Sequence, residues 1–406
     1  MRISSHQSQQ MAINAMIDQQ NELSKVQQQV ATGKKIFKPS DDPVAASQII
    51  NLRDVLGSTE QYQSNIQAAR ARLNLEEGVL KNVTDVIQRI RELTVGINND
   101  SLTPQDRSFI AEEVEQLLDE MVNLSNSTDS SGEFLFSGSK TRFRPFSRNN
   151  EGGFDYHGDD SQRFIQISSQ RQIATSDSGS DVFRNIKDGN GYFTIIDNPD
   201  NKGAGIISPG NLTGDFQTGT YIINFSKNVL PDGSTDISYK VTNDKNEIIV
   251  PEGTPYNEGD TISFNGVNTY LDGEVETGDF FVVRPSQNQD VFTTIYSLVD
   301  SVKGLTGEAK NRTALHNEVN RTLLSLDRAL ENVLEVRAGA GARLNALDGQ
   351  EDINNSYIIQ IRENLSRVED LDYSEAVSDL NLKLAGLEAS QKAFTRVQGI
   401  SLFNYI

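Results

Sequence analysis

An apolar stripe that continues from residue 52 to residue 97 constrains the fold of this 406-residue chain more than any other feature. Eleven of its fourteen positions, spaced three or four residues apart, are apolar, which is the pattern of a heptad seam. A helix of this length spans about 70 Å at ~1.5 Å per residue. Because the seam is too narrow to fold alone, it must pair with another helix of the chain. Its positions are Leu52, Val55, Thr59, Tyr62, Ile66, Ala69, Leu73, Glu76, Leu80, Val83, Ile87, Ile90, Thr94 and Ile97.

The ends of the predicted helices carry recognisable capping residues. We expect the long helix to begin at Pro43 with Asp42 as its N-cap. Proline has no backbone N–H, and at the first helical position this costs nothing, because an N–H there would have no partner within the helix. A second helix is predicted to begin after Thr103, whose capping box Asp106 completes. Apolar spacing also predicts a short helix over 291–302 and a longer one from residue 315, continuing through residue 368. Residues near 70 should then lie beside residues near 330.

Glycine and proline gather in the middle of the chain. Of 30 glycines and 10 prolines, 19 and seven lie between residues 132 and 290. Period-two alternation there predicts strands at residues 154–156, 164–167, 221–225 and 280–283. Tight turns are expected at Pro231-Asp232-Gly233, Asn265-Gly266 and Asp272-Gly273. The predicted fold class is therefore α+β, an elongated multi-helix coiled-coil rod formed by both chain ends with an inserted antiparallel β domain.

Composition argues against several functions. With 57 acidic and 37 basic residues the net charge is -20, which does not suit a nucleic-acid binder or a protein that binds anionic membranes. The absence of cysteine excludes disulfides and thiol catalysis, and three histidines supply few imidazole sites. We expect His316 to lie at the surface and Asp159-Asp160 to occupy a solvated turn rather than a metal or hydrolytic site. No enzymatic activity, cofactor or bound metal is expected.

The two ends of the chain form apolar stripes of their own. Their charge is +3 over residues 1–40 and zero over residues 374–406, so the excess negative charge lies in residues 41–373. Segments that pack against copies of themselves must avoid like charges in a dry contact. This balance favours packing between subunits over the alternative, ordinary core helices that close one bundle. The assembly residues predicted are Ile13, Met16, Leu23, Val30, Leu380, Leu384, Leu387, Phe394, Val397, Leu402 and Phe403.

Three segments resemble sequences of the bacterial flagellin superfamily. They are Ala31 to Ala46, with the run Pro39-Ser40-Asp41-Asp42-Pro43; Val336 to Leu344; and Asp370 to Ala376. Within the superfamily, Lys38 before that run, the segment from Gly132 to Thr141 followed by Pro145-Phe146, and the ending Ser401 to Ile406 are similar to the hook-associated protein 3 branch.

The resemblance implies a non-catalytic structural protein that polymerises at the hook–filament junction. It implies contacts with identical copies, with the first hook-associated protein and with flagellin, and a flagellar export chaperone. Export would be through the flagellar channel with an uncleaved N-terminal signal, to the extracellular flagellum, with no nucleic-acid partner and no membrane insertion. The first alternative is a bulk flagellin subunit. A less favoured alternative is a carbohydrate-binding or hydrolytic module in the β insertion.

The expected division of the chain follows from these patterns. Terminal polymerisation helices comprise residues 1–40 and 374–406, which should be disordered until a polymer of identical copies orders them. The helical rod core comprises residues 41–140 and 290–373. Residues 141–289 should form an inserted β-rich outer domain.

Overall fold

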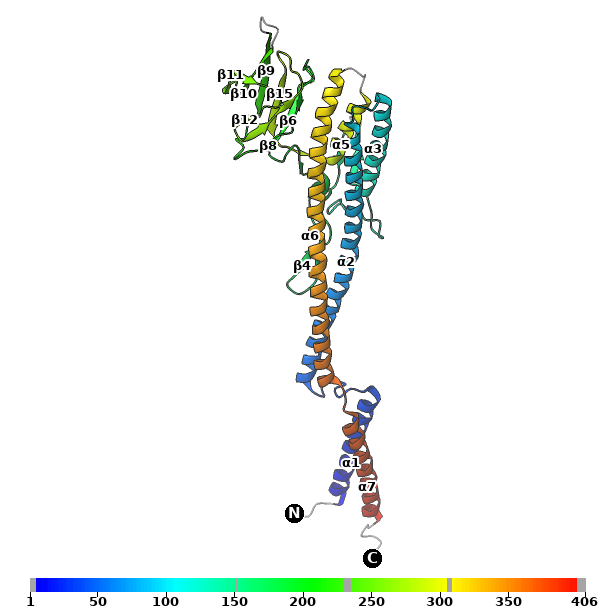
Figure 1. Ribbon diagram of the computed structural model, residues 1–406. Helices are drawn as coiled ribbons and strands as arrows, with labels where there is room; N and C mark the ends of the chain where they lie inside the picture. The colour runs from blue at the N-terminus through cyan, green and yellow to red at the C-terminus, as the bar shows by residue number, and fades with distance from the viewer. Residues whose placement is uncertain (1–4, 150–151, 230–234, 305–308, 400–406) are drawn as a thin grey trace, which may run out of the picture. The chain divides into compact units, whose positions relative to one another are not determined.

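The computed structural model describes residues 5–149, 152–229, 235–304 and 309–399 of the chain. It divides into two compact units, Met1–Ile66 with Ile167–Ser169 and Gly349–Ile406, and Gln67–Gln166 with Gln170–Asp348. The helices, shown in Figure 1, are α1 (Ser5–Thr32), α2 (Pro43–Ile97), α3 (Pro104–Ser125), α4 (Gly179–Phe183), α5 (Val291–Lys303), α6 (Ala309–Glu369) and α7 (Tyr373–Gly399).

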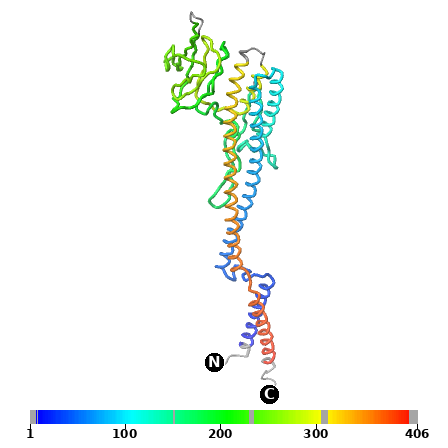
Figure 2. Tube along the Cα trace, in the orientation of Figure 1, coloured from blue at the N-terminus to red at the C-terminus, as the bar shows by residue number. Residues whose placement is uncertain are grey.

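In the first unit, α1 and α7 pack side by side and run antiparallel (Figure 2). The ε-ammonium of Lys383 on α7 lies 2.5 Å from the Glu22 carboxylate on α1. The start of α2 pairs with the end of α6 in the same unit, where Arg362 lies 2.7 Å from Glu60. Both chain ends therefore contribute helices to this unit, as the sequence predicts.

In the second unit, α2 and α6 continue as an antiparallel pair whose register is marked by ion pairs. Arg70 lies 2.6 Å from Asp348, and Arg91 lies 2.6 Å from Asp327. The expectation that residues near 70 lie beside residues near 330 is therefore wrong. A heptad stripe looks the same after every repeat, so apolar spacing alone does not fix which repeats face each other.

The predicted stripe on α2 is the buried face of the helix. Of its fourteen positions, all except Leu52, Val55 and Tyr62 are buried. In the second unit this face packs against α3, α5 and α6, and Leu80 and Ile87 lie in the same hydrophobic cluster as Phe292 of α5. The stripe predicts which side chains form the helical core.

Two helix starts follow from their capping residues. Thr103 and Asp106 form the predicted capping box at the start of α3, where the backbone N–H of Asp106 donates to the Thr103 hydroxyl. The α5 helix begins after Asp290, whose carboxylate accepts from the N–H of Thr293 at 2.6 Å. These bonds satisfy N–H groups that have no partner within a helix.

The middle of the chain forms antiparallel sheets, the largest having the strand order β11-β10-β9-β15-β6. The turn between β12 and β13 is Asn265-Gly266, whose φ angles of 43° and 86° are positive, as a type I′ turn requires. The turn expected at residues 231–233 lies outside the described residues. The strands are β1 (Phe146–Arg148), β2 (Phe154–Tyr156), β3 (Phe164–Gln166), β4 (Gln172–Ala174), β5 (Ile186–Lys187), β6 (Phe193–Asp197), β7 (Ile206–Ile207), β8 (Asn211–Leu212), β9 (Tyr221–Val229), β10 (Thr235–Asn243), β11 (Ile248–Tyr256), β12 (Ile262–Phe264), β13 (Val267–Thr269), β14 (Leu271–Asp272), β15 (Phe280–Pro285) and β16 (Asn288–Gln289).

The β region has two kinds of core within the second unit. Strands β6 to β15 enclose their own cluster around Ile223, Val241 and Phe281. The segment before them instead packs on the helices, because Phe146 and Phe183 belong to the helical cluster. The predicted fold class, helices from both flanks with antiparallel β structure inserted between them, is confirmed.

Candidate assembly surface

The terminal helices α1 and α7 bring together the residues that the sequence singles out for assembly. Leu23 is buried in the contact between them, with 7% of its surface exposed. The other members are less covered. Met16, Val30, Leu380, Leu387 and Phe394 are half-buried, Ile13 and Leu384 are exposed, and the side chain of Val397 with the whole of Leu402 and Phe403 lies outside the described part.

The α1–α7 pair also exposes large apolar side chains that the sequence did not single out. Leu382 is 69% exposed, Met11 is 52% exposed and Ile17 is 50% exposed. They lie off the predicted stripes, on faces that two helices packed against each other leave uncovered. A soluble monomer rarely exposes a large contiguous apolar surface unless it is an interaction site. The exposed apolar side chains of α1 and α7, together with Ile13, Val377 and Leu384, are called the terminal apolar surface below.

The segment that follows α1 and the segment that precedes α7 are hydrogen-bonded to each other. The N–H of Lys35 donates to the Glu369 carbonyl at 2.7 Å, and the N–H of Leu371 donates to the Gly33 carbonyl at 3.0 Å. The Glu369 carboxylate forms ion pairs with Lys34 and with Arg53. Burial acts to raise the pKa of Glu369, but the hydrogen bonds from these two cations hold it below its ordinary value. The joint is therefore structured and not a loose tether.

The acidic pair at the start of α2 has structural partners. The Asp42 carboxylate accepts from the N–H groups of Val44 and Ala45, each at 3.0 Å, and Pro43 is the first helical residue. The neighbouring Asp41 accepts from the N–H of Lys38 at 2.9 Å. Each carboxylate therefore meets backbone donors of its own turn.

The second acidic pair also serves the backbone. Asp159 accepts from the N–H of Ser139 at 2.9 Å and from the N–H of Ser161 at 3.0 Å. Hydrogen bonds from Ser139 lower the pKa of Asp159 to about 2. Within the described residues, no three His, Asp or Glu side chains converge as a metal site would require. None of the described helices combines the length and the apolar character needed to cross a membrane.

His316 departs from the expectation that it lies at the surface. It is half-buried, with ring nitrogens in contact with Asn98 and with Asp100, the latter at 3.0 Å. The turn after α2 folds over this part of α6 and covers the ring. The expectation was wrong because the partners lie more than 200 positions away in the sequence.

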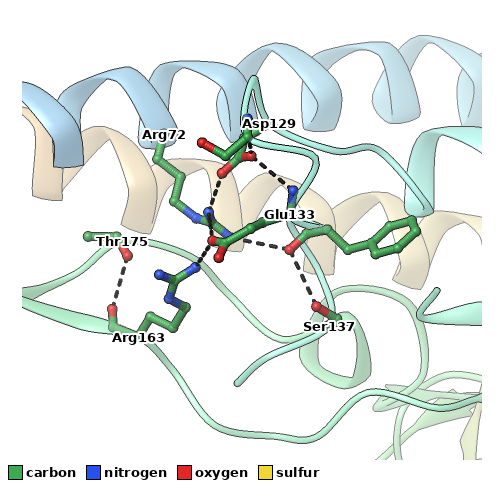
Figure 3. A network of polar contacts seen from close by, with 8 residues as sticks. Arg72, Asp129, Glu133, Ser137, Arg163 and Thr175 are labelled. Atoms are coloured by element: carbon green, nitrogen blue, oxygen red, sulfur yellow. Dashed lines mark hydrogen bonds and ion pairs between the residues drawn. The ribbon is translucent and has the colours of Figure 1, made fainter. Parts of the chain in front are cut away.

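A partly buried ionic network joins the loops of the second unit to α2 (Figure 3). Arg72 lies 2.7 Å from Asp129 and also donates to the Phe134 carbonyl at 3.2 Å. Glu133, within reach of Arg72, also pairs with Arg163. Burial, and next the charge of Arg163, lowers the pKa of Arg72.

One turn further along α2, Glu76 is wholly buried. One of its carboxylate oxygens accepts from the N–H of Asp177 at 2.8 Å, and the other has no partner. Burial and then the charge of Asp177 raise the pKa of Glu76 to about 8. Asp177 in turn pairs with Arg343 of α6. The network and the role of Glu76 were missed in the sequence, because the partners on α2, on α6 and in the loops between them are far apart along the chain.

A groove of about 520 Å³ lies in the first unit between the start of α2, the end of α6 and the tip of the β3–β4 hairpin. Its apolar walls are Val55, Tyr62, Ile353 and Tyr357, and Asp54 lies at its edge. It is called the α2–α6 groove below.

Comparison with known proteins agrees with this architecture. The family model of the bacterial flagellin N-terminal helical region matches residues 3–141. The flagellar hook-associated protein 3 of Salmonella typhimurium is 26% identical over 403 residues, which cover 99% of each chain.

Two solved structures from Legionella pneumophila extend the similarity to the fold. The flagellar hook-associated protein 3 has a TM-score of 0.75 and 31% identity, covering 79% of this chain and 98% of that one. The flagellar junction protein FlgL has a TM-score of 0.70 and 31% identity, covering 79% of this chain and 99% of that one. On this similarity, the chain belongs to the flagellar hook-associated protein 3 family.

Proposed function

We propose that this protein is a structural subunit of the bacterial flagellum that polymerises at the junction between hook and filament. The observation that carries the proposal is the terminal apolar surface in a chain that belongs to the hook-associated protein 3 family. The similarity over the full length of a hook-associated protein favours a junction subunit over a bulk flagellin. The protein acts by packing, and we propose that it has no catalytic activity.

The proposed mechanism is burial of the terminal apolar surface between copies. Each Leu, Ile or Phe side chain gains roughly 1.5–3 kcal/mol when it is fully buried. Fixing the backbone of one residue costs roughly 1–2 kcal/mol, so one helix pair gains little by ordering alone. Neighbouring subunits supply the missing contact, and the near-neutral charge of both ends keeps repulsion in that contact low.

The proposed division of the chain into domains follows from the same reasoning. Residues 1–40 and 374–406 form the polymerising part, residues 41–140 and 290–373 form the supporting helical core, and residues 141–289 form the outer part. Within the polymerising part, the residues proposed for assembly are Ile13, Met16, Leu23, Val30, Leu380, Leu384, Leu387, Phe394, Val397, Leu402 and Phe403, of which Leu23 holds α1 against α7.

The proposed partners are identical copies, the first hook-associated protein on the hook side and flagellin on the filament side. The chain is exported through the flagellar channel to the outside of the cell, and a dedicated export chaperone covers its terminal segments before export. A terminal apolar surface that is uncovered in one chain explains why such a chaperone is needed, because exposed apolar surface promotes aggregation.

Labelling of purified hook–filament structures tests the proposal. Antibody fragments against residues 193–285, which carry the separate β core, should mark a thin zone between hook and filament in electron micrographs. A filament labelled along its whole length would instead identify a bulk subunit. Flagella that carry no label would contradict both assignments.

A further inference from the structure

A basic loop projects an aromatic side chain from the second unit. Phe143 is 65% exposed, more than any other described phenylalanine. Arg142 and Arg144 flank it, are exposed, and form no ion pair with a described residue. In a chain whose net charge is -20, two unpaired arginines beside an exposed ring are unusual. Residues 140–144 are called the basic loop.

The backbone of the basic loop is held in place. The N–H of Phe143 donates to the Lys140 carbonyl at 3.0 Å, and the N–H of Phe134 donates to the Thr141 carbonyl at 2.8 Å. Phe134 is itself fixed, because its carbonyl accepts from Arg72 in the network of Figure 3. A ring presented on a fixed loop loses little conformational entropy when it binds.

The α2–α6 groove has complementary chemistry. Val55 and Tyr62 are two of the three stripe positions of α2 that are not fully buried in this chain. Across the groove, Ile353 is 62% exposed and Tyr357 is 49% exposed. The carboxylate of Asp54, which lines the groove, is exposed and forms no ion pair with a described residue.

We propose that the basic loop of one copy docks into the α2–α6 groove of a second copy, with Phe143 between the apolar walls and a flanking arginine on Asp54. The inference rests on the proposed self-assembly and names two surfaces that contribute to it. Because loop and groove are different patches, the contact joins copies head to tail, which builds a ring or a helical array.

Charge favours a second copy as the occupant. Two chains that each carry a charge of -20 repel one another, so a contact between copies requires local patches of opposite sign. The basic loop and the carboxylate of Asp54 in the groove supply them. The groove volume of about 520 Å³ falls within the roughly 300–1,000 Å³ of ordinary binding sites, so it can admit an aromatic side chain with its flanks.

Cross-linking tests the contact directly, since the full chain contains no cysteine. One full-length chain carries Phe143→Cys and a second, tagged for size, carries Ile353→Cys. Both substitutions replace exposed side chains, so they leave the core intact. Mixed at a concentration at which the protein oligomerises and treated with a short bismaleimide, they should give a cross-linked heterodimer. Each variant alone should give none, because the contact is head to tail.

Phe109→Cys is the matched control for Phe143→Cys, because Phe109 is 59% exposed but lies on α3 away from the basic loop. It should not cross-link to Ile353→Cys. Oligomers without the Phe143–Ile353 cross-link would overturn the docking contact and leave the proposed self-assembly standing. A chain that stays monomeric at every concentration would overturn both.

Charge reversal provides a second measurement that does not depend on cross-linking. The pair R142D and R144D should weaken association about tenfold, because the introduced carboxylates then repel the carboxylate of Asp54. Asp54→Arg should weaken it by a similar factor, and a chain with all three changes should recover most of the loss. Failure of the combined variant to recover, with the loop pair and Asp54→Arg each weakening association, would show that the two surfaces do not meet.

Discussion

Two helix pairs in this protein have similar apolar patterns but very different surroundings. Along α2 in the second unit, Leu73, Leu80 and Ile87 have no exposed surface. In the α1–α7 pair of the first unit, Leu382, Met11 and Ile17 are at least half exposed. The periodicity alone does not distinguish the two pairs.

The difference arises from the number of neighbours. The α2 stripe in the second unit is covered by α3, α5, α6 and aromatic residues such as Phe136 and Phe183, so its apolar positions are buried. A helix in a two-helix pair has one covered face only. The α1–α7 pair therefore has the apolar pattern of a core helix pair but lacks the packing partners, which other copies of the chain would supply in the proposed assembly.

Removal of residues 374–406 should show the difference between the two helix pairs most strongly, because it should abolish assembly and leave the second unit folded. The second unit keeps its core, so circular dichroism should still show one cooperative thermal transition for it, whereas sedimentation should show no assembly. Leu23 and Val26 of α1 lose their partner, so α1 should stay unprotected against hydrogen exchange at concentrations at which assembly protects it in the full chain. Assembly by the shortened chain equal to that of the full chain would refute the role of the terminal helices.

Single leucine truncations measure the same contrast residue by residue. Leu80→Ala should lower the free energy of unfolding by about 2–5 kcal/mol, because it leaves a cavity in a packed core. Leu382→Ala, at a side chain that is 69% exposed, should change it by less than about 0.5 kcal/mol but should weaken assembly. Chemical denaturation measures the changes in the free energy of unfolding, and sedimentation measures the change in assembly. A destabilisation of similar size for both variants would show that the pairs are equally packed.

The buried Glu76 should give the α2 core a pH dependence that the exposed helices lack. The folded chain holds a proton on Glu76 up to a pKa of about 8, while the unfolded chain releases it near the ordinary value of 4.5. The free energy of unfolding should therefore fall as the pH rises from about 5 to about 8 and should stay constant at higher pH. The total fall should be roughly 1.4 kcal/mol for each unit by which the folded and unfolded pKa values differ.

Glu76→Gln should flatten that fall, because the amide carries no charge at any pH in this range. Glu77→Gln is the matched control, since Glu77 is the next residue on α2, is partly exposed and pairs with Arg337. It should keep the slope of the unaltered chain. Parallel pH profiles for Glu76→Gln and the unaltered chain would show that Glu76 is ionised in the folded state.

Local patterns in the sequence predict local structure well. The α2 stripe predicts the buried face, Thr103 with Asp106 predicts the start of α3, and Asn265-Gly266 predicts a hairpin turn, because each signal acts through neighbours within a few residues. The fold class follows from these elements.

Contacts between distant segments were not predictable in the same way. The register that brings Arg70 beside Asp348 is one of several that the repeated apolar pattern allows. The network of Arg72 and Glu133 needs loops whose positions depend on the whole fold. The exposure of Leu382 depends on how many helices surround α7, which the stripe of α7 does not state.

The smallest expected effect concerns the first turn of α2, where the comparison can be made within a single helix. Asp42→Ala removes the acceptor for the N–H groups of Val44 and Ala45, and loss of such a cap costs about 1 kcal/mol. Because α2 continues far beyond this turn, the cost should appear as roughly fivefold faster hydrogen exchange at these two amides, with the exchange at Leu80 unchanged. Asp42→Asn keeps an oxygen acceptor and should restore most of the protection. Faster exchange along the whole of α2 would show instead that this turn nucleates the helix.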